Sequence, residues 1–409
     1  MINNVQPVLL GGDLNCYSVA RAFHEYLGVK SIAFGKMELG VIKHSRIVEF
    51  KTAPQINDKE YMVKTLRNLG EKLKKTGRTA ILMGCSDIYV SMIIDCKDQL
   101  EDLYILPYPS KELKNKMLDK QSFYELCEKY GVAYPKTATY DPAKKNLPEN
   151  LMYPLILKPA NPIKYWKKRF EGMEKIYFAK DLDEVKYAIN SIYSGDYDEN
   201  IIIQEYIPGD DSKIWTPTCY SDKTGRAKMV VTGHVLLEEH VPTARGNDAA
   251  IINEHNQALA ETMVDFLDKL GFVGFTNADV KYDERDHKFK IFEINIRQGR
   301  SNYSVTAGGS NIAELVTEDY VLGKELKLVM QKKPYFWSLV PDSVIKKHVS
   351  DKALVNKAMT LKKQGNYAST LFYDYDLRLN PKRYFYVTAN FYNHIRKFNK
   401  YYTKGDGVK

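Results

Sequence analysis

Residues 277–283, NADVKYD, and residues 291–301, IFEINIRQGRS, decide the fold. In both stretches apolar and polar residues alternate with a period of two, which is typical of strands with one buried face. The linker between them, residues 283–288, is wholly charged or polar. The two stretches are therefore expected to pair as a hairpin.

The predicted hairpin carries oxygen ligands on one face. Glu293 and Asn295 stand two residues apart on a strand, so their side chains point to the same side, and Asp279 joins them if the register aligns the strands. Such a set suits Mg²⁺, which takes one or two carboxylates and completes its shell with water and nucleotide phosphates. The alternative is a solvated edge hairpin. Arg297 and Arg300, placed directly after these residues, favour a site that holds an anion.

Five stretches of the chain form a recognisable series. They are PVLLGGDLN at 7–15, SFYE at 122–125, LKPAN at 157–161, QEYIPGDDS at 204–212 and FEINIRQGRS at 292–301. The last three are specific in their order and separation. On these stretches the chain, from Pro7 to about Tyr402, resembles the D-aspartate ligases, which are ATP-grasp carboxylate–amine ligases of bacterial cell-wall synthesis.

The fold class expected is α/β, as an α+β ATP-grasp protein with three parts. They are an N-terminal parallel α/β domain (1–115), a two-part ATP-grasp domain (116–330, with a lid subdomain at about 145–207 and a metal-bearing subdomain at about 208–330), and a basic, aromatic C-terminal extension (331–409). A length of 409 residues with 44% hydrophobic residues supports two or three cores. The five cysteines are scattered without metal-ligand spacing, and no signal peptide or long apolar segment is present, so the protein is expected to be cytoplasmic.

The first 115 residues alternate between strand-like and helix-like patterns, with strands at 8–10, 31–34 and 79–84 and a helix at about 16–26. This alternation predicts a parallel α/β unit. Its turns at 11–13 and 84–87 lie where open α/β sheets bind ligands, so either turn is a candidate for positioning an amino-acid substrate. The alternative is a tight turn in which Asp13 caps a helix.

Two lysines are candidates for phosphate contacts. Lys158 ends an apolar strand, where a buried ammonium needs a counter-charge. Lys120 begins a helix, and by itself it is better explained by an ordinary salt bridge. The resemblance implies that both contact the α and β phosphates of ATP.

The predicted strand 201–207 stops at a Pro-Gly pair. The resemblance makes it the hinge of the ATP-grasp domain, where backbone groups beside Glu205, Tyr206 and Ile207 meet the adenine edge. Asp210 and Asp211 are candidates for the ribose hydroxyls, or form an acidic turn. The basic segment 166–175 is either a lid over the triphosphate or a solvated turn.

Histidines and one further arginine carry weaker signals. His234, His240 and His255 do not form a metal constellation, and no catalytic role is assigned to them. Arg245 is a weaker candidate for holding a carboxylate or phosphate.

The resemblance implies ADP-forming amide synthesis with ATP, and two Mg²⁺ ions are expected. The carboxylate attacks the γ-phosphorus, and the resulting acyl phosphate is attacked by an amine, while Lys158 and either Arg297 or Arg300 offset the developing charge. By resemblance the acid is D-aspartate, activated at its β-carboxylate, and the acceptor is the lysine ε-amine of a UDP-muramyl pentapeptide. The alternatives are another acid or acceptor, or a non-catalytic nucleotide-binding protein with a basic surface.

The charge of the chain is concentrated in its last part. Residues 331–409 hold 16 Lys and Arg against 5 acidic residues, a charge of +11, whereas residues 1–330 carry −2. Basic residues interleaved with aromatics bind nucleic acid, an anionic precursor or a membrane surface. No nucleic-acid motif accompanies them, so no nucleic-acid partner is expected. The favoured interpretation is that the aromatics pack on the ligase core and the lysines face solvent.

Overall fold

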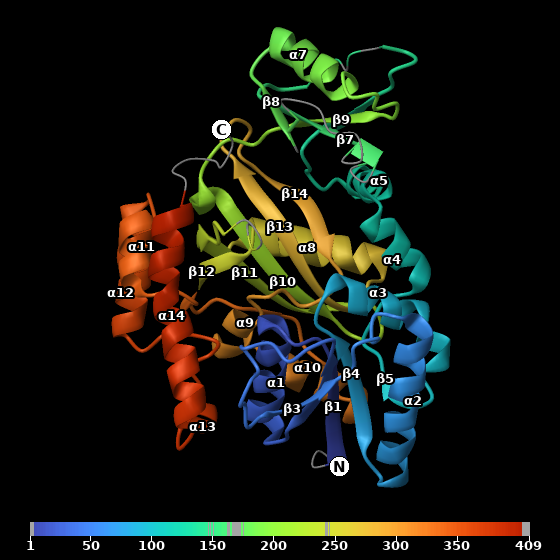
Figure 1. Ribbon diagram of the computed structural model, residues 1–409, viewed down its shortest axis with the longest axis vertical. Coiled ribbons are helices and arrows are strands. Elements are labelled where there is room, and N and C mark those ends of the chain that lie inside the picture. Colours follow the sequence, from blue (N-terminus) through green and yellow to red (C-terminus); the bar gives the residue numbers. More distant parts are fainter. Residues whose placement is uncertain are drawn as a thin grey trace. The chain divides into compact units, whose positions relative to one another are not determined.

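The computed structural model describes residues 4–145, 147, 149, 151–161, 164–165, 173–174, 176–241, 244 and 246–402. The chain divides into two compact units (Figure 1). Unit 1 contains the described residues of Met1–Val132, Asp210–Val280 and Glu293–Lys404, and unit 2 those of Ala133–Gly209 and Lys281–Phe292. The domain boundaries expected from the sequence at residues 115 and 330 stay a prediction.

Unit 1 begins with a parallel five-stranded sheet in the order β3-β2-β1-β4-β5. The strands and helices predicted for this region are confirmed, and the turns at 11–13 and 84–87 follow the adjacent strands β1 and β4. The elements are β1 (Val5–Leu10), α1 (Leu14–Leu27), β2 (Ser31–Gly35), β3 (Val48–Thr52), α2 (Lys59–Lys75), β4 (Thr79–Gly84), α3 (Asp87–Asp95), β5 (Tyr104–Ile105), α4 (Lys111–Leu118) and α5 (Lys120–Tyr130).

The second sheet has eight strands, and the predicted hairpin forms one of its edges as β13 and β14. Seven strands follow the order β14-β13-β10-β11-β12-β16-β17, and β15 pairs with β11. The distal part of the hairpin, Lys281–Phe292, belongs to unit 2. The elements are β10 (Ile214–Ser221), β11 (Ala227–Glu238), β12 (Asp248–Asn253), α8 (Gln257–Leu270), β13 (Gly274–Asp283), β14 (Lys288–Asn295), β15 (Val329–Met330), β16 (Tyr335–Ser338) and β17 (Tyr367–Ala368).

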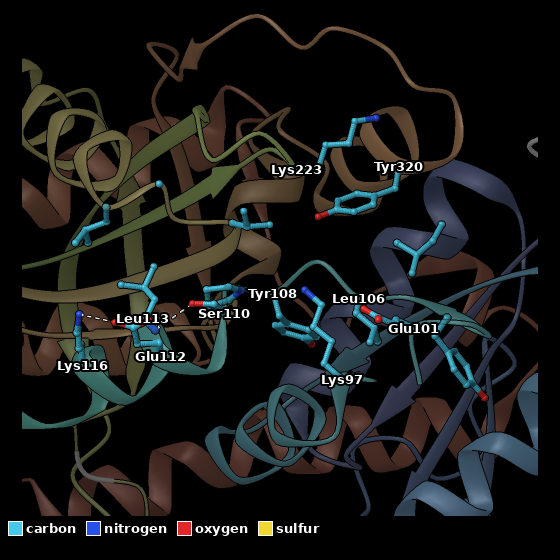
Figure 2. A pocket seen from close by; sticks show the side chains of 16 residues that line it. Lys97, Glu101, Leu106, Tyr108, Ser110, Glu112, Leu113, Lys116, Lys223 and Tyr320 are labelled. Carbon is cyan, nitrogen blue, oxygen red and sulfur yellow. Dashed lines mark hydrogen bonds and ion pairs between the residues drawn. The ribbon is translucent and has the colours of Figure 1, made fainter. Parts of the chain in front are cut away.

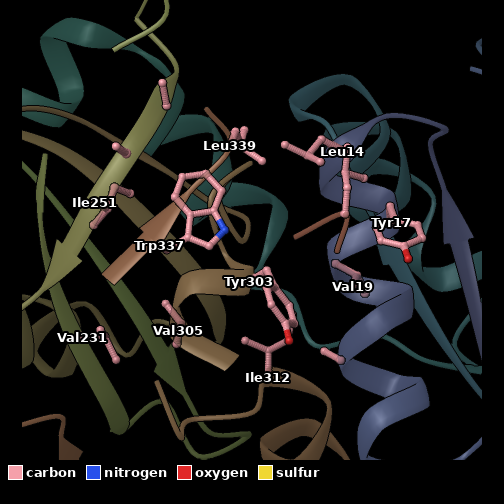
Figure 3. Close-up of a cluster of buried hydrophobic side chains, with 14 of the residues drawn as sticks. Leu14, Tyr17, Val19, Val231, Ile251, Tyr303, Val305, Ile312, Trp337 and Leu339 are labelled. Atoms are coloured by element: carbon pink, nitrogen blue, oxygen red, sulfur yellow. The ribbon is translucent and has the colours of Figure 1, made fainter. Parts of the chain in front are cut away.

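The C-terminal extension packs into unit 1. Trp337, Val387 and Phe398 are buried in the same hydrophobic cluster as helix α1, and Figure 3 shows Trp337 and Leu339 opposite Leu14. None of the described helices is long and apolar enough to cross a membrane. Helices α9 (Tyr303–Ala307) and α10 (Ile312–Val316) precede the extension. The helices of the extension are α11 (Asp342–His348), α12 (Lys352–Lys363), α13 (Asp374–Leu377) and α14 (Pro381–Tyr401).

A buried ion pair joins α14 to α13, and its carboxylate also contacts the N-terminal part of unit 1. Arg383 and Asp376 are both fully buried and are joined at 3.0 Å. Asp376 also accepts hydrogen bonds from the Tyr17 hydroxyl at 2.7 Å and the Arg46 amide at 2.5 Å. The basic and aromatic residues of the extension thus include structural contacts as well as exposed side chains such as Phe385.

Unit 2 is built on a four-stranded sheet in the order β6-β9-β7-β8. Along β7 the burial alternates, so Leu155 and Leu157 enter the hydrophobic core while Ile156 and Lys158 lie on the other, partly buried face. The elements are β6 (Thr137–Tyr140), β7 (Leu155–Pro159), β8 (Tyr177–Ala179), α7 (Leu182–Tyr193) and β9 (Ile201–Glu205).

Candidate active site

Asp279 and Glu293 lie on the neighbouring strands β13 and β14, with a hydrogen bond between their side chains. Burial and the Glu293 carboxylate together raise the pKa of Asp279 well above its ordinary value, because two carboxylates in contact cannot both ionise cheaply. Lys120, at the start of α5, donates to Glu293 Oε2 at 2.9 Å. The hairpin therefore holds two adjacent carboxyl groups with a lysine beside them.

Asn295 is on the same face of β14 as Glu293. Its Nδ2 donates to the Asn277 carbonyl at 3.2 Å, and its Oδ1 accepts from Arg297 Nη2 at 3.3 Å. Among the described residues no group of three or more His, Cys, Asp or Glu side chains is arranged to hold a metal ion. A cation at this hairpin would therefore depend on the two carboxylates, the Asn295 amide oxygen and oxygens from outside the protein.

Arg297 makes a two-pronged ion pair with Asp87, the first residue of α3. Its Nε and Nη2 atoms lie 2.7 and 2.9 Å from the two carboxylate oxygens. The Arg297 side chain is 17% exposed, whereas that of Asp87 is 53% exposed. Because its partner is largely solvated, this arginine can exchange the carboxylate for another anion at modest cost.

Hydrogen bonds connect the segment after β14 to the chain at the two turns of the parallel sheet, residues 11–13 and 84–87. Asn15 Nδ2 donates to the carbonyls of Cys85 at 3.0 Å and Gln298 at 3.1 Å. Gln298 Nε2 donates to the Gly84 carbonyl at 3.0 Å, and Asn302 Nδ2 to Asn15 Oδ1 at 2.8 Å. These bonds bring the two turns and the Arg297–Ser301 segment to one place in unit 1.

A glycine is required inside this segment. A Cβ atom at Gly299 would lie 2.6 Å from Asn277 Oδ1, which is closer than side chains tolerate. The path of the chain between Arg297 and Arg300 therefore depends on the missing side chain.

Asp248 is an acid that the sequence analysis did not single out. It accepts from Ser301 Oγ at 2.8 Å, and burial raises the pKa of its carboxyl to about 6 although Ser301 and Arg300 oppose the shift. Its charge also contributes to the raised pKa of Asp279. No local pattern marks Asp248, because it opens an ordinary buried strand.

Asp210 and Asp211, at the 3₁₀ turn before β10, each accept a hydrogen bond from a backbone amide. Asp210 Oδ1 accepts from the Ser212 amide at 3.0 Å, and Asp211 Oδ2 from the Glu238 amide at 2.9 Å. His234 supports the same turn, because its Nε2 lies 2.7 Å from the Ser212 carbonyl. These contacts give His234 a structural role.

In unit 2, the Glu205 side chain is occupied by structural contacts. Its Oε1 accepts from the Met152 amide at 2.9 Å, and its Oε2 lies 3.6 Å from the buried Lys290 ammonium. The Tyr206 amide donates to the Pro154 carbonyl at 2.9 Å.

The remaining predicted hinge residues of unit 2 are placed as follows. Ile207 is buried, and Lys281 donates to the Gly209 carbonyl at 2.6 Å with its ammonium over the Tyr206 ring. Lys281 is a further cation beside the predicted hinge, and the sequence patterns did not indicate it.

Two of the sequence predictions lie outside the described residues. They are Arg245 and the basic segment 166–175, except for Met173 and Glu174.

Unit 1 contains a cavity of about 770 Å³ whose lining includes Lys97, Lys223 and Tyr320 (Figure 2). None of the residues predicted for the site lines it. A smaller cavity of about 220 Å³ is lined by Arg300. Of the predicted residues, Arg300 lines this smaller cavity, whereas Asp279, Glu293 and Asn295 lie on the hairpin.

No family model matches the chain. The fold is similar to that of the L-amino acid ligase from Bacillus licheniformis (TM-score 0.54, 16% identity, 80% of this chain and 75% of that chain). It is also similar to N5-carboxyaminoimidazole ribonucleotide synthetase in an ADP complex (0.55, 15%, 82% and 81%) and to the biotin carboxylase domain of Hydrogenobacter thermophilus 2-oxoglutarate carboxylase with MgADP (0.55, 14%, 79% and 71%). These neighbours are ATP-grasp enzymes, so the predicted fold class is confirmed.

The sequence comparison identifies the family within this class. The D-aspartate ligase of Enterococcus faecium (strain Aus0004) is 33% identical over 423 aligned residues, which cover 100% of both chains. The chain belongs to the D-aspartate ligase family. The predictions of an ATP-grasp ligase and of its family are thereby confirmed.

Proposed function

We propose that the protein joins the β-carboxylate of D-aspartate to the lysine ε-amine of a UDP-muramyl pentapeptide, with release of ADP and phosphate. The observation that carries this proposal is the identity with D-aspartate ligase along the whole of both chains. A carboxylate is a poor electrophile, and its conversion to an acyl phosphate makes phosphate the leaving group. We place the reaction in the cytoplasm, because it uses ATP and a nucleotide-linked precursor.

The acid pair of the hairpin is suited to Mg²⁺, for which we propose two ions. Asp279 and Glu293 raise the cost of each other's ionisation, and a divalent cation held between such carboxylates would offset that repulsion. Asp279, Glu293 and Asn295 would hold the metal. When bound, Mg²⁺ supplies positive charge that offsets the charge of the phosphate oxygens.

We assign nucleotide contacts to the residues that the resemblance to D-aspartate ligases indicates. Lys158 and Lys120 would contact phosphate oxygens, and backbone groups around Glu205–Ile207 the adenine edge. The Tyr206 amide does not take this role, because it already donates a hydrogen bond to the Pro154 carbonyl. Asp210 or Asp211 would accept from the ribose hydroxyls.

In the proposed reaction, a β-carboxylate oxygen of D-aspartate attacks the γ-phosphorus and ADP leaves. The lysine amine then attacks the acyl carbon, and phosphate leaves with that carboxylate oxygen. Arg297 or Arg300 offsets the charge on the tetrahedral oxygen. Arg297 is suited to this task because its partner Asp87 is exchangeable.

ADP release with Mg²⁺ tests the proposal when a panel of D- and L-amino acids is offered with and without UDP-muramyl pentapeptide. Mass spectrometry identifies the product. We expect ADP with D-aspartate and a precursor heavier by one aspartyl residue. Turnover with another acid would replace D-aspartate in the proposal, and no turnover with any pair would refute it.

A further inference from the structure

The 220 Å³ cavity of unit 1 joins the Arg297–Ser301 segment to the C-terminal helix α14. Its polar lining includes Arg300, Glu239, and the α14 residues Asn390, His394 and Lys397. Apolar side chains such as Leu14 and Leu371 complete the wall. The extension therefore contributes polar groups to a cavity that also contains a candidate site arginine.

Glu239 presents a carboxylate to this cavity. Its side chain is buried, and His394 Nε2 lies 3.2 Å from Oε1. The other oxygen, Oε2, is buried without a hydrogen-bond partner among the described residues. Burial by itself would raise the pKa of Glu239, but His394, Arg300 and Lys397 lower it below its ordinary value, so the carboxylate stays ionised.

Arg300 presents the opposite charge. Its Nη1 atom is buried and has no hydrogen-bond partner in the part of the chain that the structure describes. Lys397 adds a second, partly buried cation to the same lining. Buried charged atoms without partners are costly, so Glu239 Oε2 and Arg300 Nη1 mark positions at which a ligand can supply hydrogen bonds.

We propose that this cavity binds the α-amino-acid head group of the acid substrate, with its α-carboxylate on Arg300 and Lys397 and its α-ammonium on Glu239. The proposal rests on the proposed function and names the residues that select the acid. The Glu239 carboxylate would repel a free phosphate, and the Arg300 guanidinium would repel a lone amine. A zwitterion satisfies both charges.

The size of the cavity agrees with such a ligand. Pockets for drug-sized molecules occupy about 300–1,000 Å³, so a cavity of about 220 Å³ suits a smaller molecule. Contacts to the ammonium and the α-carboxylate would fix two substituents of the α-carbon. The reacting β-carboxylate would fix the third, which is the side chain. Three fixed substituents distinguish D- from L-aspartate.

Two analogues separate the contacts, because succinate lacks the α-ammonium and β-alanine lacks the α-carboxylate. Dissociation constants are measured by calorimetry with MgADP present. We expect Glu239→Gln to raise the dissociation constant of D-aspartate by about tenfold or more and to leave that of succinate unchanged. Lys397→Met should weaken D-aspartate and leave β-alanine unchanged.

Lys400→Met is the matched control, because Lys400 lies exposed on the same helix and does not line the cavity. This variant should change the dissociation constants of neither the analogues nor D-aspartate. If Glu239→Gln does not fold, Lys397→Met carries the test, since that side chain is partly exposed. Unchanged D-aspartate affinity in a folded Glu239→Gln or Lys397→Met variant would overturn the inference.

Failure of this inference differs from failure of the proposed function. Normal ligation of D-aspartate by the wild type and both cavity variants, with unchanged KM, refutes the cavity assignment alone. If the wild type ligates no amino acid, the proposed function fails, and binding of D-aspartate by calorimetry then decides the cavity separately. Binding that depends on Glu239 and Lys397 supports the assignment, and absence of binding refutes it.

Discussion

Glu293→Gln separates the chemical role of the hairpin from its structural role. The substitution keeps the shape of the side chain and one carbonyl oxygen, and removes the negative charge. It breaks the ion pair with Lys120 and takes away the charge that raises the pKa of Asp279. We expect a folded protein with little ligase activity.

The cost in stability is small. The side chains of Lys120 and Glu293 are 43% and 47% exposed, and exposed ion pairs contribute less than about 1 kcal/mol. Relief of the repulsion with Asp279 opposes even that loss. Removal of an anionic metal ligand should lower turnover about 100-fold or more, which corresponds to about 2.7 kcal/mol of barrier.

The assay combines ADP release with thermal denaturation in the absence and presence of MgADP. MgADP should raise the melting temperature of the wild type more than that of Glu293→Gln. Glu112→Gln is a matched control, because it removes an exposed ion pair with Lys116 at 2.8 Å outside the site. Glu293→Gln that turns over normally, and gains as much stability from MgADP as the wild type, would refute the metal assignment.

Three further substitutions test the surroundings of the site. Gly299→Ala places a Cβ 2.6 Å from Asn277 Oδ1, so we expect a fall in kcat that a steady-state assay detects; unchanged kcat would show that the segment can move. Asp376→Ala leaves Arg383 buried without its carboxylate and should destabilise the protein by about 3–5 kcal/mol, seen as a lower melting temperature. The Asp248 pKa is raised from 3.8 to about 6, so the folded state loses stability as pH rises between those values. The Asp248→Asn variant does not suffer this loss, which is at most about 3 kcal/mol. Melting temperatures measured across pH should show the variant to be more stable than the wild type at neutral pH but not at about pH 4.

Local sequence patterns predicted the strands and helices but not all of the contacts between residues that are distant in the sequence. The period-two alternation located both hairpin strands, and the Glu293–Asn295 spacing placed two side chains on one face. The Arg297–Asp87 pair joins positions far apart in the chain, so no short motif indicates it. Asp248 and Glu239 were missed for the same reason, because each follows or opens an ordinary strand and gains its significance only from tertiary contacts.

The C-terminal extension shows the same limit. Its charge and aromatic content left nucleic acid, membrane and core packing open as interpretations. The buried Trp337 and the Arg383–Asp376 pair show that part of it completes the fold of unit 1. Its composition gave no indication that His394 and Lys397 line a cavity, because the sequence does not reveal which face of α14 packs inward.

Transfer of ¹⁸O tests most directly whether the protein activates a carboxylate as an acyl phosphate. D-Aspartate labelled with ¹⁸O in its β-carboxylate is turned over with ATP and UDP-muramyl pentapeptide, and the released phosphate is analysed by mass spectrometry. We predict one ¹⁸O atom in each phosphate, because the bridging oxygen of the acyl phosphate leaves with phosphorus. Product formation with unlabelled phosphate would contradict the claim.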